Sequence, residues 1–127
     1  MIPEGLKFTK SDEWVKLDGD TASIGITDVA ITELSDIVFI EFPNVGSKVS
    51  QNAPFGVIES VKAVFDLNSP VSGEVIAINE DVSNNLELLK EDAYNNGWLI
   101  KVKVSDKNEL NNLMDLNEYQ NMPREHH

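Results

Sequence analysis

The 127-residue sequence has no cysteine, and its only two histidines are the last residues, His126 and His127. Without a thiol, the chain has no disulfide, no cysteine nucleophile and no thiolate metal site. The two histidines follow Pro123-Arg124-Glu125, a position typical of a purification-tag remnant. When they are set aside, no histidine remains for acid–base catalysis, a catalytic triad or a zinc site. The sequence therefore predicts neither a metal centre nor an enzyme with an active site of its own.

Positive charge and long apolar runs are also scarce. Ten basic residues against 22 acidic ones give a formal net charge of −12, and the lysines are scattered rather than clustered. Such a surface repels phosphate, so we expect no nucleic-acid binding. No run of 18 apolar residues exists, and Met1 to Gly5 lacks the basic flank and apolar stretch of a signal peptide. We therefore expect no membrane association.

The composition is that of one ordinary globular domain. Apolar residues make up 41% of the chain, and a chain of this length can bury one substantial core. We expect a single domain over 1–127, with a core at about 6–104. A helical appendage is expected at about 105–121.

Short apolar segments separated by turn residues fill most of the first 104 positions, which predicts a mostly β protein. Asp18-Gly19 is a strong signal for a two-residue hairpin turn. Strands about ten residues apart favour a flattened barrel or sandwich. The expected strands are 14–17, 21–26, 37–42, 55–59, 64–67, 73–78 and 99–104.

A few short helices are expected beside the strands, most of them marked by a residue that can cap a helix N-terminus. The expected helical segments are 28–34 capped by Thr27, 106–114 capped by Ser105, a last helix from Asp115 to about Tyr119, and one turn within 84–92.

One lysine lies alone between two apolar strands. Lys62 is the only basic residue between Lys48 and Lys90, and its neighbours Val61 and Ala63 are small and uncharged. A hairpin turn at Val61-Lys62 places this side chain at the tip, and without Gly, Asn or Asp the turn should be of type I. The residues alone leave two interpretations open: a solvated turn residue, or a lysine that another enzyme modifies.

The segment from Gly56 to Ala63 resembles the lipoyl-attachment motif of the H proteins of the glycine cleavage system. The resemblance runs from about Leu6 to Tyr119, and five further motifs agree with that family in order and spacing. They are Glu13-Trp14-Val15, Gly25-Ile26-Thr27-Asp28, Asp36-Ile37-Val38-Phe39-Ile40, Ser69-Pro70-Val71-Ser72-Gly73-Glu74-Val75 and Gly97-Trp98-Leu99-Ile100-Lys101. The chain departs from the family's usual residues at Asp12, Phe65 and Asn95-Asn96.

The resemblance implies a non-catalytic carrier of the biotinyl/lipoyl-carrier fold type, a flattened hybrid of barrel and sandwich. Lys62 would hold lipoate through an amide on its Nζ, as N6-lipoyllysine. The arm would take the aminomethyl group of glycine from a pyridoxal-phosphate glycine decarboxylase to a tetrahydrofolate-dependent aminomethyltransferase. A dihydrolipoamide dehydrogenase using FAD and NAD would then reoxidise it. Enzymes that attach the lipoyl group are further implied partners.

The same resemblance implies roles for other residues. Glu59, Ser60, Val61 and Ala63 are expected to help the attaching enzymes recognise the turn, although Glu59 is equally explained as a surface charge that discourages edge pairing. Glu13 is a candidate contact for the loaded arm, because a nearby carboxylate would favour a cationic amine. The alternative for Glu13 is an ordinary surface charge.

Two alternative functions stay open. One is a lipoyl or biotin carrier domain of another complex, although biotin carriers typically flank their lysine with methionine and this chain has Val61 and Ala63. The other is a lipoate-relay or H-like protein that passes lipoyl groups to other acceptors. We expect a monomer, in the cytoplasm if the source is bacterial and in the mitochondrial matrix if it is eukaryotic.

Overall fold

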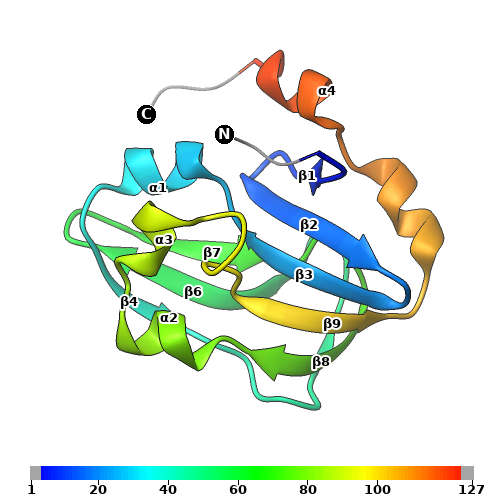
Figure 1. Cartoon of the computed structure of the whole chain (residues 1–127), viewed down its shortest axis with the longest axis horizontal. Coiled ribbons are helices and arrows are strands. Elements are labelled where there is room, and N and C mark those ends of the chain that lie inside the picture. The colour runs from blue at the N-terminus through cyan, green and yellow to red at the C-terminus, as the bar shows by residue number, and fades with distance from the viewer. Residues whose placement is uncertain (1–3, 124–127) are drawn as a thin grey trace.

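The computed structural model describes residues 4–123 and contains two antiparallel sheets with short helices around them (Figure 1). The larger sheet has the strand order β1-β2-β3-β9-β8-β5, and the smaller has the order β4-β6-β7. This architecture confirms the expected mostly β class with a sandwich-like arrangement. No helix in the described part of the chain is long and apolar enough to cross a membrane.

The larger sheet joins the two ends of the chain. Strands β3 and β9 pair antiparallel with Ile24 opposite Ile100, so segments more than 70 residues apart lie side by side. The β2–β3 turn differs by one residue from the prediction. Asp18 pairs with Thr21, so Gly19 and Asp20 form the turn, and Gly19 has φ of 63°, as the first position of a type II′ turn requires. The strands are β1 (Lys7–Phe8), β2 (Glu13–Asp18), β3 (Thr21–Ile26), β5 (Lys48–Val49), β8 (Gly73–Ile78) and β9 (Ile100–Val104).

The smaller sheet carries the segment that the sequence singled out. Its strands are β4 (Ile37–Glu41), β6 (Pro54–Ser60) and β7 (Val64–Asn68). β6 is the central strand, and β4 and β7 are the two edges. Gly56 is required here, because a Cβ at this position would lie 2.3 Å from the carbonyl oxygen of Glu41.

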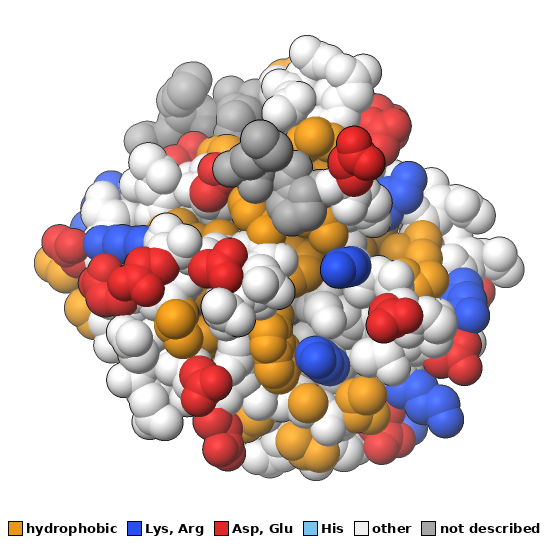
Figure 2. Space-filling view, viewed as in Figure 1, with side chains coloured by type: hydrophobic (Ala, Val, Ile, Leu, Met, Phe, Trp, Pro, Cys, Tyr) orange, Lys and Arg blue, Asp and Glu red, His pale blue; other side chains and the backbone are white. Residues whose placement is uncertain are grey.

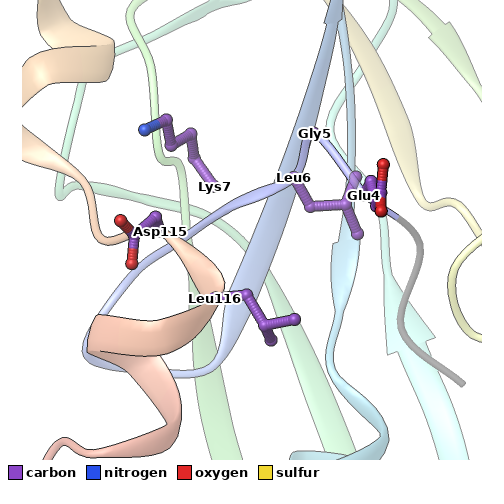
Figure 3. Close-up of a pocket in the computed structure, with 6 residues that line it drawn as sticks. All are labelled: Glu4, Gly5, Leu6, Lys7, Asp115 and Leu116. Atoms are coloured by element: carbon purple, nitrogen blue, oxygen red, sulfur yellow. The ribbon is translucent and has the colours of Figure 1, made fainter.

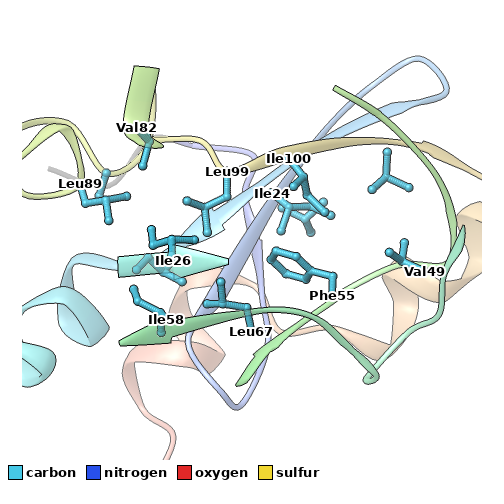
Figure 4. Packing of buried hydrophobic residues seen from close by; sticks show 14 of the residues in the cluster. Ile24, Ile26, Val49, Phe55, Ile58, Leu67, Val82, Leu89, Leu99 and Ile100 are labelled. Atoms are coloured by element: carbon cyan, nitrogen blue, oxygen red, sulfur yellow. The ribbon is translucent and has the colours of Figure 1, made fainter. Parts of the chain in front are cut away.

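The core fills the space between the two sheets (Figure 4). Ile24 and Ile100 from the larger sheet and Ile58 and Leu67 from the smaller one are almost fully buried. A second cluster surrounds Trp14, which is 1% exposed and whose indole N–H donates to the carbonyl of Ala93 at 3.0 Å. Burial of this apolar surface supplies the main stabilisation of both sheets.

Helices α1, α2 and α3 gather at one end of the sheets, and α4 packs beside the edge strand β1 (Figure 1). Helix α1 (Asp28–Leu34) begins as expected, because the side chain of Thr27 accepts a hydrogen bond from the Ala30 N–H. The expected turn within 84–92 is present as α3 (Leu88–Glu91). The sequence reasoning missed α2 (Glu80–Asn84), which is capped by Asn79.

The C-terminal segment differs from the prediction in its first half. Residues Lys107–Asn112 form a 3₁₀ helix capped by Asp106, rather than an α-helix capped by Ser105 over 106–114. Helix α4 (Leu116–Gln120) begins as expected, with Asp115 in a reciprocal capping box with Glu118. Met114 bridges to β1 through hydrogen bonds with Phe8. The expected tag remnant at His126 and His127 lies outside the described residues.

Candidate functional site: the β6–β7 hairpin

The β6–β7 hairpin presents Lys62 at its end. Ile58 pairs with Phe65 and Glu59 pairs with Val64, so the chain reverses over Ser60 to Ala63. Val61 and Lys62 occupy the tip, and both are exposed. The predicted position of the lysine is therefore confirmed.

Two hydrogen bonds between Ser60 and Ala63 close the turn. The backbone N–H of Ser60 donates to the Ala63 carbonyl at 2.8 Å, and the Ser60 hydroxyl accepts from the Ala63 N–H at 3.2 Å. Neither Val61 nor Lys62 has a positive φ, in agreement with a turn that needs no glycine. Ser60 is buried, so its observed contacts are structural.

A backbone hydrogen bond ties the tip to a second part of the chain. The Val61 N–H donates to the carbonyl of Asp36 at 2.9 Å, in the connection between α1 and β4. The Asp36 carboxylate lies 3.8 Å from the ammonium of Lys90 on α3. The tip is thus held by its own turn and by a neighbouring loop, which limits its freedom to bend.

Lys62 itself is open to other molecules. Within residues 4–123, no hydrogen bond or ion pair engages its ammonium group. Its Nζ can therefore reach another protein without first breaking an internal contact. The exposed position leaves room for a long acyl group on Nζ, so it fits a covalently tethered group.

Glu59 lies between two exposed apolar side chains on the outer face of the smaller sheet. It pairs with Phe39 of β4 on one side and with Val64 of β7 on the other. Cross-strand partners share one face of a sheet. Because β6 is the central strand, Glu59 does not guard a sheet edge, and the explanation by edge pairing is wrong. Glu59 is partly exposed on this face, which leaves its carboxylate accessible to a partner.

Glu13 is not a surface charge, and the structure contradicts that interpretation. Its side chain is 1% exposed. The hydroxyls of Thr9 and Ser11 donate to Oε1, and the Asn68 N–H donates to Oε2 at 3.0 Å. Burial raises the pKa of this carboxyl from 4.5 to about 7, against the lowering effect of the three hydrogen bonds. Glu13 therefore joins the β1–β2 loop to the end of β7.

Two surface hollows are lined by other elements. One lies between the N-terminal strand and α4, lined by Glu4 to Lys7 with Asp115 and Leu116 (Figure 3). The other is lined by Asn79, Asp81, Asn84, Asn85, Leu88, Asn96 and Trp98. Neither contains Lys62 or Glu13. Among residues 4–123, no group of three or more Asp, Glu, His or Cys side chains is arranged to hold a metal ion.

The sequence profile of a family described as Glycine cleavage H-protein matches residues 6–126. The chain belongs to the glycine cleavage H-protein family. The match spans both sheets, the hairpin and α4, so the resemblance carried by the six motifs is confirmed. H proteins are non-catalytic lipoyl carriers of the glycine cleavage system, and this chain is such a carrier. The family's cofactor is covalently bound lipoate.

Individual H proteins agree with this assignment along most of their length. The glycine cleavage system H protein of Halothermothrix orenii is 51% identical over 93% of this chain and 92% of its own. A mitochondrial H protein of Oryza sativa is 50% identical over 93% of this chain and 72% of its own. The crystal structure of the Mycobacterium marinum H protein superposes with a TM-score of 0.83 at 32% identity, covering 93% of this chain and 95% of that one.

Sequence reasoning missed the contacts that fix the H-protein hairpin and its surroundings. The carbonyl of Asp36 holds the tip, although the residue drew attention only as part of a family motif. Asn68 reaches Glu13 across 55 positions of sequence. No local pattern marks either contact, because both depend on how distant segments pack.

Proposed function

We propose that Lys62 is the residue of this chain that carries lipoate, joined to its Nζ by an amide. The supporting observation is the hairpin itself: an exposed lysine with no partner among the described residues 4–123, at the tip of a turn closed by Ser60 and Ala63. Acylation removes one positive charge and takes the formal net charge from −12 to −13. When bound, the lipoyl group would supply a disulfide that is reduced as it takes up the glycine-derived one-carbon unit, and the two thiols left after that unit is passed on would be oxidised back to the disulfide.

The residues around Lys62 provide a stiff mount for that arm. The Val61 N–H is held by the Asp36 carbonyl, and Ser60 holds Ala63. Movement is therefore concentrated in the lysine side chain and the group attached to it. A tether on a fixed base keeps its end at high effective concentration near a docked partner.

Membership of the glycine cleavage system implies the decarboxylase, the aminomethyltransferase and the dihydrolipoamide dehydrogenase as partners. We infer that the chain visits each of them as a monomer through brief encounters. Its charge of −12 favours partners with basic patches and weak, salt-sensitive contacts. The lipoyl-attaching enzymes complete the proposed set. The compartment stays a prediction, cytoplasmic for a bacterial source and the mitochondrial matrix for a eukaryotic one.

We also propose Glu13 as a contact for the loaded arm, on the condition that the arm displaces a group already bonded to its carboxylate. Its oxygens already accept hydrogen bonds from Thr9, Ser11 and Asn68. An amine on the arm would have to displace one of these donors. Ser11 is the exposed member of the three, so exchange is most readily accommodated there.

Intact mass measures the proposal directly. Incubation of the unmodified chain with a lipoate–protein ligase, lipoate and ATP should add the mass of one lipoyl group. Lys62→Arg should abolish the addition. Lys48→Arg is the control, because Lys48 is an exposed lysine outside the hairpin, on β5, and it should leave the addition unchanged. A full lipoyl mass on Lys62→Arg would refute the assignment.

Reconstitution separates the carrier role from the relay alternative. When the lipoylated chain is mixed with the glycine decarboxylase, it should support the exchange of labelled carbon dioxide into the carboxyl group of glycine. A fully lipoylated chain that gives no exchange, yet donates its lipoyl group to other acceptors, would identify a relay protein. The whole-chain family match favours the carrier over a biotin carrier or a dehydrogenase lipoyl domain.

A further inference from the structure

The exposed apolar side chains of this protein are concentrated around the proposed lipoyl-lysine. Among residues 4–123, seven large apolar side chains are exposed, and five of them lie on the β6–β7 hairpin or on the adjoining β4. At the end of the molecule where this hairpin lies, the space-filling view shows apolar and acidic side chains together, with basic atoms among them (left in Figures 1 and 2). The five residues, called here the hairpin collar, are Val38, Phe39, Val61, Val64 and Phe65.

The hairpin collar surrounds the hairpin rather than covering one face of it. Phe39 and Val64, 52% and 63% exposed, both neighbour Glu59 and so lie on the outer face of the sheet. Phe65 pairs with the buried Ile58, so it lies on the opposite face, and it is half exposed on the edge strand. A flat surface cannot contact both faces at once, whereas a cleft that receives the hairpin end can.

Acidic residues continue the outer face beyond the collar. Glu41 and Asp66 both pair with Val57, two residues along β6 from Glu59, which places all three carboxylates on the outer face. Both Glu41 and Asp66 are exposed. The matching surface on a partner is therefore apolar inside the cleft and basic at its rim.

We propose that the hairpin collar is the docking surface for the enzyme that forms the amide on Lys62, and that this enzyme receives the hairpin end in an apolar cleft with a basic rim. The proposal rests on Lys62 as the attachment site. The short distance between Nζ and the backbone is the chemical reason. The lysine Nζ is only four methylenes from the backbone, so an active site that acts on Nζ must enclose the hairpin end. Enzymes that act on the sulfur end of the finished arm work further away.

The reaction that this docking serves is an acyl transfer from an activated donor, lipoyl adenylate. The neutral Nζ attacks the acyl carbon, the C–N amide bond forms, and the bond from the acyl carbon to the phosphate oxygen breaks. AMP leaves. The two protons that the lysine ammonium loses pass to a base of the enzyme or to solvent. The collar takes no part in this chemistry and supplies only the binding that positions Nζ.

The test compares variants of the unmodified chain as substrates of a lipoate–protein ligase, with kcat/KM measured by intact mass over time. Phe39→Ser and Phe65→Ser should each lower kcat/KM about tenfold, mainly through KM, because buried aromatic anchors dominate interface energies. Val64→Ser and Val45→Ser form a matched pair, since these valines are 63% and 59% exposed. Val64→Ser should cost severalfold, and Val45→Ser, outside the collar, less than twofold.

A second measurement separates docking from damage to the fold. The same variants, lipoylated to completion by long incubation, should have their lipoyl disulfide reduced by dihydrolipoamide dehydrogenase and NADH within twofold of the wild-type rate. The pair Glu41→Gln and Asp66→Asn alters only exposed charges, so it provides folded variants whatever the serine substitutions do. Combined, these two changes should raise the ligase KM severalfold at low salt and flatten its dependence on ionic strength.

Three results would overturn the docking proposal: wild-type ligase kinetics for both phenylalanine variants, an equal loss for Val45→Ser, or an equal loss in the dehydrogenase assay. These outcomes leave the attachment site standing. A wild-type chain that gains no lipoyl group at Lys62 is a different result, because it refutes the proposed function itself and the docking surface with it.

Discussion

Substitution Glu13→Gln should remove a pH dependence from the stability of this protein. The folded state raises the pKa of Glu13 from 4.5 to about 7, chiefly because burial disfavours the charged form. The folded state therefore binds the Glu13 proton more tightly than the unfolded state. The stability that this proton contributes is complete below about pH 4.5, and it is lost as the pH rises through about 7.

The size of the effect follows from the same shift. An increase from 4.5 to about 7 is worth about 3 kcal/mol, at about 1.4 kcal/mol per pKa unit. Glutamine stays neutral throughout, so the unfolding free energy of wild type minus that of Glu13→Gln should fall by about 3 kcal/mol between pH 4 and pH 8. The glutamine amide group forms a poorer hydrogen bond with the Asn68 N–H than a carboxylate oxygen does. This loss shifts the free energy of unfolding of the variant by a constant amount and adds no pH dependence.

Urea unfolding of both proteins across this pH range measures the difference. The buried Trp14 is next to Glu13 in sequence and provides a fluorescence signal for the transition. Contributions of the other carboxyl groups cancel in the subtraction as long as the sites are independent. Two curves that stay parallel within about 0.5 kcal/mol, or a difference that rises with pH, would refute the reasoning. A carbon-13 NMR titration of the Glu13 carboxyl carbon gives its pKa independently.

Three further substitutions test the packing by urea unfolding at neutral pH. Gly25→Ala should destabilise the fold by about 1–3 kcal/mol, because the added Cβ would lie 2.6 Å from the ring of Trp14; unchanged stability would contradict that close approach. Tyr119→Phe should cost about 1–2 kcal/mol, since its hydroxyl bonds with Thr27 at the cap of α1, and a neutral result would mean that the C-terminal helix contributes no stability through this contact. Asp115→Ala should cost about 1 kcal/mol through the lost cap of α4, whereas Asp115→Asn should retain most of it.

Local patterns predicted the elements whose signals are themselves local. Thr27 and Asp115 are recognisable as caps because a capping side chain bonds within three residues. The two apolar strands that flank Lys62 predict its place at a hairpin tip. The β2–β3 turn was misplaced by one residue, because Asp18-Gly19 is equally compatible with two registers. Only the pairing of Asp18 with Thr21 decides between them.

The contacts around the candidate site depend on segments far apart in the sequence. The sequence leaves Glu13 as either an arm contact or a surface charge, because nothing local reveals the loop and the β7 backbone that enclose its side chain. The 3₁₀ helix after β9 was expected as an α-helix because its apolar residues have helical spacing. The carboxylate of Glu109 instead accepts hydrogen bonds from the N–H and the hydroxyl of Ser72. No local propensity predicts this long-range contact.

The pairing of β3 with β9 also bears on the order in which the protein can assemble during synthesis. Ile24 meets Ile100, and at roughly 5–20 residues per second a ribosome needs on the order of 4–15 seconds to make the chain between them. During that time one edge of β3 lacks its strand partner. The β6–β7 hairpin is local and can form earlier, since nearby contacts cost less loop entropy. The two sheets can therefore form at different times during synthesis. The larger sheet is complete only after the C-terminal third of the chain has emerged.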